Sequence, residues 1–112
     1  MIRHIVFFRM KEGKEAEAGR LAHALSALKV GTGGLMRECE VAHDVVHAKN
    51  SYDVALNSVF AGRDDLEKYR VHPEHVKVLD LIHEVCHDTV KVDYDLGSSI
   101  GSTKQKNRDH YS

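Results

Sequence analysis

The first strand-like segment, IRHIVFFRM at residues 2–10, carries apolar side chains on both of its faces. Successive side chains of a β-strand point to opposite faces, so Val6 and Phe8 lie on one face and Phe7 on the other. A strand that is apolar in both directions needs cover on both sides. The segment therefore predicts a central strand of a sheet that is covered on both faces.

Helical and strand-like patterns alternate along the first half of the chain. Apolar residues recur at helical spacing over residues 15–28, and the GTGG run at residues 31–34 ends that helix because glycine weakens a helix interior. Residues 35–43 predict a strand at the edge of the sheet, and the polar stretch HDVVHAKNS predicts a loop or a ragged hairpin arm. Residues 52–60 alternate again and predict a second central strand.

The second half of the chain predicts two helices and a closing strand. Asp64 or Asp65 is the expected cap of a short helix that ends near Tyr69. Pro73 is expected to begin the next helix, because its missing N–H would have no partner there. The buried side of that helix is expected to consist of Val76, Leu79 and Ile82. Residues 89–95 alternate and predict the last strand.

The resulting order is strand, helix, strand, strand, helix, strand. This is the ferredoxin-like βαββαβ arrangement of the α+β class, in which an antiparallel sheet carries its helices on one face. The other face stays bare, and the apolar side chains of the central strands would then form a large exposed patch. We therefore expect a homodimer formed through the sheet faces.

Length and the closing sequence define one domain and a tail. The chain has 112 residues, 42% of them hydrophobic, which fits a single domain at residues 1–96. The sequence LGSSIGSTKQKNRDHYS after Asp95 has the glycine, serine and charge content of a disordered segment. Residues 97–112 are therefore expected to form a disordered or arm-like tail.

Charge and cysteine content limit the partners and the compartment. The chain has 16 basic and 17 acidic residues and a formal net charge of -1, so no basic field favours nucleic acid. The apolar run at the N-terminus is shorter than a signal-peptide core, and no run is long enough to span a bilayer. Cys39 and Cys86 lie far apart without a CxxC pattern, which suits reduced thiols. We expect a cytoplasmic protein with no membrane or nucleic-acid partner.

The segment YRVHPEHVKV, which begins at Tyr69, gathers two imidazoles and a phenol at one helix start. His75 falls in the first turn, where the positive helix end opposes protonation and favours the neutral imidazole that a general base needs. Tyr69 is either a hydrogen-bond donor in the same site or an ordinary aromatic core residue. His72 is either a substrate-binding residue or simply the cap of the helix.

Two further residues are candidates for the same site. Asp93 is expected to orient His75, because a carboxylate on one imidazole nitrogen leaves the other nitrogen as a base. Its alternative is a solvated charge on a strand. His4 shares the buried face of the first strand and either lines the site or is a core histidine bonded to the backbone.

The histidine content also raises the question of a metal site. His83 and His87 stand four residues apart, a spacing that can present two imidazoles on one helix face. Glu84 lies between them, so the segment has the HExxH spacing, but the helix is expected to end there and the two imidazoles would then not share a helix face. Cys39 and Cys86 have no cation nearby in the sequence, so buried small hydrophobes are expected rather than nucleophiles. We expect no metal and no cofactor.

Several of these segments together resemble the stress-responsive α/β-barrel domain, often abbreviated Dabb. The segments are RHIVFFRMK, YDVALNSVF, the Y-x-x-H-P-x-H motif that begins at Tyr69, and the closing VKVDYD. The motif is the most specific of them, and the resemblance spans nearly the whole chain except the tail. It implies ferredoxin-like protomers whose sheets face each other in a homodimeric α/β barrel.

The functional implication of the resemblance is a pocket between sheet and helices. Most such domains are small proteins without an assigned role, some of them linked to stress tolerance, but one plant branch that is similar in fold and motif acts as a polyketide cyclase. In that branch the residues matching Tyr69 and His75 carry the chemistry, and one matching His4 lines the pocket. The cyclase has a further histidine at the start of the third strand, where this chain has Val54.

Two hypotheses therefore stand at the level of the sequence. The first is a small homodimer that binds or transforms a small apolar carbonyl compound without a cofactor, by cyclase-like or proton-abstraction chemistry of the lyase or isomerase kind. The second is a non-enzymatic, stress-related dimer that acts through its stability or through a protein partner. A largely apolar cleft of roughly 300 Å³ or more, with polar groups converging on it, would favour the first.

Overall fold

Strands and helices follow one another in the predicted order over residues 1–98, 100 and 101, which the computed structural model describes. The elements are β1 (Ile2–Met10), the 3-10 turn η1 (Glu15–Glu17), α1 (Ala18–Ser26), α2 (Leu28–Gly31), β2 (Met36–His43), β3 (Val54–Phe60), α3 (Arg63–Arg70), α4 (Pro73–Val85), β4 (Cys86–Asp95) and the 3-10 turn η2 (Leu96–Ser98). This order confirms the ferredoxin-like α+β class.

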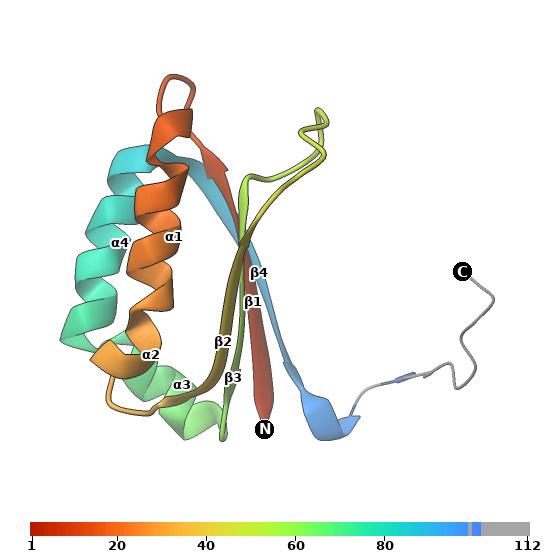
Figure 1. Ribbon diagram of the computed structural model, residues 1–112. Helices are drawn as coiled ribbons and strands as arrows, with labels where there is room; N and C mark the ends of the chain where they lie inside the picture. Colours follow the sequence, from red (N-terminus) through yellow and green to blue (C-terminus); the bar gives the residue numbers. More distant parts are fainter. Residues whose placement is uncertain (99, 102–112) are drawn as a thin grey trace.

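The strands form one antiparallel sheet in the order β2-β3-β1-β4. The two strands that are apolar on both faces, β1 and β3, are therefore central, and β2 lies at an edge as predicted. Figure 1 shows all the helices on one side of the sheet, with its other face open. In the register, His4 of β1 lies opposite Ser58 of β3 on one side and Asp93 of β4 on the other.

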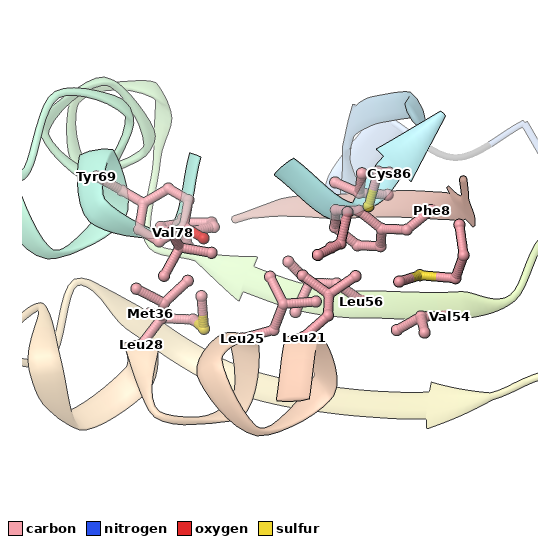
Figure 2. Packing of buried hydrophobic residues seen from close by; sticks show 14 residues of the cluster. Phe8, Leu21, Leu25, Leu28, Met36, Val54, Leu56, Tyr69, Val78 and Cys86 are labelled. Atoms are coloured by element: carbon pink, nitrogen blue, oxygen red, sulfur yellow. The ribbon is translucent and has the colours of Figure 1, made fainter. Parts of the chain in front are cut away.

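The core lies between α1 and the central strands. Leu21, Leu25 and Leu28 are spaced at one helical turn or two, so they share one face of the α1–α2 segment and are buried on the sheet. Figure 2 shows this cluster extending from Tyr69 and Val78 at one end to Phe8 and Cys86 at the other.

The glycine run ends the first helical segment, as the sequence predicts. α2 stops at Gly31, and Gly33 and Gly34 have φ values of 69° and 88°. An L side chain rarely adopts these angles, so glycine is required for this turn into β2.

The open face of the sheet is apolar over its β1 and β4 half. Phe7 of β1 and the alternate residues Val90, Val92 and Tyr94 of β4 point away from the helices and are exposed. These four side chains are called the apolar stripe below. In a single chain nothing in the described residues covers the stripe, although the predicted strand pattern requires cover there.

Three local expectations are wrong. Gly62, not Asp64 or Asp65, is the N-cap of α3, and both aspartates lie in its first turn. The buried face of α4 consists of Val78 and Val85, with Leu79 and Ile82 half-buried and Val76 exposed. Val78 and Val85 are seven residues apart and therefore lie on the same face of the helix, while Val76 lies on another face. β4 begins at Cys86 rather than Thr89, because α4 passes directly into the strand without turn residues.

The expected tail begins where the sheet ends. The backbone N–H of Leu96 donates to the carbonyl oxygen of Met1 at 2.9 Å, which fastens the end of β4 to the start of β1. Most of the segment expected to form a tail, residues 97–112, lies outside the described residues. Within the described part of the chain, no helix has the length and apolar character needed to cross a membrane.

Candidate functional site

A cavity of about 1080 Å³ lies between the sheet and the helices α3 and α4. It forms at the β4 edge, because β4 presents the polar side chains Thr89, Lys91 and Asp93 to the helix side and does not pack an apolar face against α4. Its apolar walls include Val6, Phe8, Leu56, Leu66, Leu79 and Ile82. The cavity is therefore mostly apolar, with polar groups gathered along β4 and at the α3–α4 junction.

Tyr69 stands at the end of α3 with its ring in the core, and it is one of the residues that line this cavity. The side chain is only 2% exposed, and its ring centroid lies 4.9 Å from that of Phe60 and 4.3 Å from that of His75. Among the described residues, the hydroxyl has no hydrogen-bond partner. Burial, with a smaller effect from the Cys39 thiol, raises the pKa of Tyr69, so the phenol stays neutral and can donate.

His75 lies in the first turn of α4, where Pro73 opens the helix. Its Nδ1 is 2.9 Å from the carbonyl oxygen of Arg70. A carbonyl oxygen only accepts, so Nδ1 carries the proton and Nε2 keeps its lone pair in the neutral ring. Burial lowers the pKa of His75, although the bond to the Arg70 carbonyl opposes that shift, and the imidazole of His4 lowers it further.

His4 is the second imidazole of the cavity, and its partner is Asp93. Nδ1 of His4 contacts Oδ1 of Asp93, and the other carboxylate oxygen accepts a bond from Nζ of Lys91 at 2.6 Å. Burial alone would raise the pKa of the Asp93 carboxyl, but the bonds from Lys91 and His4 outweigh it and lower the pKa. An ionised carboxylate only accepts, so Nδ1 of His4 carries the proton of this contact.

The expected pairing of Asp93 with His75 is therefore corrected. Asp93 lies opposite His4 in the sheet register and contacts that ring, while the Arg70 carbonyl positions His75. The rings of His4 and Tyr69 have centroids 6.2 Å apart, so the structure brings His4, Tyr69, His75 and Asp93 to one cavity.

His72 lies apart from this group. It is the N-cap of α4, and its Nδ1 accepts a hydrogen bond from the backbone N–H of Glu74 at 3.1 Å. Its ring is not among the lining residues of the cavity. The structure therefore shows His72 as the cap of the helix, and His72 is not part of the candidate site.

Lys91 is a lining residue that the sequence pattern did not single out. Lys91 and Asp93 alternate with Val90 and Val92 along β4, so both charges share one face of the strand. The alternation was visible in the sequence, but it also fits a solvated edge strand. Only the register with β1 shows that the face of β4 with Lys91 and Asp93 lines the cavity.

The thiols and the remaining histidines do not form a second centre in the described residues. Burial raises the pKa of the Cys39 thiol, and that of Cys86 to about 11, so both thiols stay protonated near neutral pH. His83 lies on α4 and His87 on β4, so they do not share a helix face. No group of three or more His, Cys, Asp or Glu side chains suited to a metal ion occurs in residues 1–98, 100 and 101.

Comparison with known proteins places this chain in a family. The model of the stress responsive A/B barrel domain matches residues 2–96. An uncharacterized protein of Streptomyces coelicolor is 31% identical over 77 residues, which cover 67% of this chain and 79% of that protein. A dimeric ferredoxin-like protein of unknown function from Thermobifida fusca is 28% identical and superposes with a TM-score of 0.75, covering 85% of this chain and 90% of that one.

The same fold also occurs in an enzyme. The hydroxynitrile lyase of Passiflora edulis superposes with a TM-score of 0.75, covering 89% of this chain and 96% of that one. It is 18% identical, so this likeness concerns the fold alone. The family match spans nearly all of the described chain, including the motif from Tyr69 to His75. The chain therefore belongs to the stress responsive A/B barrel domain family.

Proposed function

We propose that this protein binds a small apolar carbonyl compound in the cavity and removes a proton from the carbon next to the carbonyl. The observation that carries the proposal is the buried Tyr69 hydroxyl, which has no partner in the described residues and belongs to a ring beside the imidazoles of His4 and His75, the second of which keeps Nε2 unprotonated in its neutral form. A buried hydroxyl left without a partner costs stability, so a position that keeps one is suited to a ligand oxygen.

The size and lining of the cavity define the class of ligand. About 1080 Å³ exceeds the roughly 300 Å³ of a small-molecule site, and the walls away from β4 are apolar. The charges of Asp93 and Lys91 neutralise each other at 2.6 Å, so the polar end does not favour an ion of either sign. A neutral compound with one apolar part and one carbonyl oxygen fits this lining.

The proposed reaction uses each side chain in a stated role. Nε2 of His75 takes the proton, the electron pair of the broken C–H bond moves into the new C=C bond, and the carbonyl oxygen becomes an enolate oxygen. Tyr69 donates its hydrogen bond to that oxygen as negative charge develops. The pair formed by His4 and Asp93 offers a second acceptor for a hydroxyl of the ligand. A positioned general base contributes typically about 10²–10⁴-fold to the rate.

We further propose that a second copy covers the open sheet face. The apolar stripe is exposed in the single chain, and Phe7, Val90 and Val92 of the stripe are not among the residues that line the cavity. Packing two such faces together would bury both stripes and complete an α/β barrel. The dimeric state described for the Thermobifida fusca protein supports this arrangement.

Hydrogen exchange of a simple ketone tests the reaction. Benzylacetone and longer alkyl methyl ketones, incubated in D₂O, should lose their α-proton NMR signals faster with the protein than in buffer. His75→Ala should return the rate to the buffer value, while His23→Ala should not, because His23 is exposed on α1 and does not line the cavity. Equal rates for the protein and for His75→Ala would refute the base and favour the non-enzymatic dimer.

A further inference from the structure

The loop between β2 and β3, residues 44–53, stands on the open side of the sheet. Figure 1 shows it turned away from the helices, at the top of the sheet. Its first half exposes two adjacent apolar side chains, Val45 at 84% and Val46 at 72%. Isolated exposed valines are ordinary, but these two share the side of the molecule that also carries the apolar stripe.

The base of the loop is fastened to the sheet. The backbone N–H of Asp44 donates to the carbonyl oxygen of Asp53 at 2.9 Å, and the N–H of Asp53 donates to that of Phe8 at 2.8 Å. The Asp53 carboxylate also accepts the backbone N–H of Met10 at 2.7 Å. These three hydrogen bonds therefore fix the direction in which the loop leaves the sheet.

The tip is bonded internally. The carboxylate of Asp44 accepts the backbone N–H of His47 at 2.6 Å, and Ala48 and Ser51 exchange two further bonds. These bonds hold the turn together without any packing of Val45 and Val46 against the rest of the chain. A contact made by the two valines would therefore require little ordering of the loop on association.

The loop is continuous with the apolar stripe. Tyr52, at the end of the loop, packs against Phe7 with ring centroids 6.4 Å apart. The Tyr52 hydroxyl donates to Asp88 at 2.8 Å, and the Arg9 guanidinium lies 4.3 Å from the centre of its ring. The open face and the loop thus form one surface, with a packed aromatic residue at their junction.

The two valines are close enough to a second sheet to contact it. Val45 and Val46 follow Asp44, whose backbone N–H is bonded at the base of the loop. In an extended chain their Cα atoms lie at most about 7 Å beyond Asp44, and packed sheets lie about 10 Å apart. The valine side chains can span the remaining distance, so this part of the loop can contact the rim of a second sheet packed on the open face.

We propose that the loop at residues 44–53 is a clasp, which contacts a second copy of this chain through Val45 and Val46. This inference rests on the homodimer of the proposed function and adds a second contact region to it. In a two-fold dimer each copy would supply one loop and receive the other, so the four valines would be buried together.

Aspartate substitutions at matched positions test the clasp. Val45→Asp with Val46→Asp should raise the dimer dissociation constant at least about 100-fold in sedimentation velocity, because the double change places two charges in each copy where the valines would make an apolar contact. The control is Val30→Asp with Val71→Asp, whose valines are 87% and 58% exposed at the ends of helices on the other side of the sheet. This control should dissociate like the unmodified protein. Serine at positions 45 and 46 gives a milder version that preserves the loop.

The outcomes separate the clasp from the dimer itself. Unchanged far-UV circular dichroism with weakened association of the loop variant alone supports the clasp. Equal dissociation constants for the loop variant, the control and the unmodified protein overturn it and leave the sheet-face dimer intact. A monomeric unmodified protein at micromolar concentration overturns both.

Discussion

Replacing Tyr69 with phenylalanine tests whether its hydroxyl serves a ligand or stabilises the fold. The Tyr69→Phe change removes one oxygen from a side chain that is otherwise fixed in the core beside Phe60 and His75. In the described residues that oxygen has no partner, so no protein hydrogen bond is lost. Tyr52→Phe is the matched control, because the Tyr52 hydroxyl donates to the Asp88 carboxylate at 2.8 Å.

Only one of the two variants should lose stability. Burying a hydroxyl without a partner costs about 1–3 kcal/mol, and water entering a cavity of this size recovers part of that cost. Tyr69→Phe should therefore leave the free energy of unfolding unchanged or raise it by about 1 kcal/mol. Tyr52→Phe loses a bond to a partly exposed carboxylate and should lower it by about 1 kcal/mol.

Urea and thermal unfolding at fixed protein concentration measure both changes. One kcal/mol corresponds to a shift of about 4–8 °C in Tm for a domain of this size. The ketone exchange rate of Tyr69→Phe should fall although its stability does not. A loss of stability for Tyr69→Phe as large as that for Tyr52→Phe would show that the hydroxyl has a structural partner, and the reasoning about the site would fail.

Three further changes have defined outcomes. Asp93→Asn should remove a pH-dependent part of the stability. Because the pKa of Asp93 is lowered in the folded protein, its contribution is present above the unfolded value of about 3.9 and is lost as pH falls through the folded value. The difference in unfolding free energy from the unmodified protein should therefore be constant above about pH 5 and shrink as pH falls from about pH 5 through the folded pKa. A constant difference over that range would contradict this. Phe7→Asp should give a folded monomer, because Phe7 is exposed on the open face. Light scattering measures the mass and circular dichroism the fold, and a dimer that persists would place the interface elsewhere. Truncation after Gly97 should leave Tm unchanged, because the bond from Leu96 to Met1 is kept, and a large drop would show that the tail docks on the fold.

Local signals in the sequence were sufficient for most of the fold. The strand Ile2–Met10 has the predicted bounds, and α4 begins at Pro73 as expected, because side-chain alternation and the missing proline N–H act within a few residues. The central positions of β1 and β3 followed from the need to cover both of their faces. The exposed Val76 was not predictable, because the buried face of a helix depends on the elements that it packs against.

Which side chains contact each other within the site depends on how strands that are far apart in the sequence pair. His4 and Asp93 are 89 positions apart in the chain and meet because β4 pairs with β1. The sequence indicated that both belong to one site, but it could not show which histidine the carboxylate contacts. The unpaired Tyr69 hydroxyl is likewise a property of the packed cavity, and no pattern of residue types reveals it.

The two faces of strand β4 belong to different surfaces of the molecule, the cavity on one side and the open sheet face on the other. Asp93 faces the cavity, while its neighbour Val92 faces the open side, and His4 alternates in the same way with the half-buried Arg3 and Ile5 of β1. In the proposed dimer, the two cavities would be divided only by two sheets packed back to back. A displacement of β4 on ligand binding in one copy would then reach the other copy directly, so the two sites would have a short path for cooperative binding.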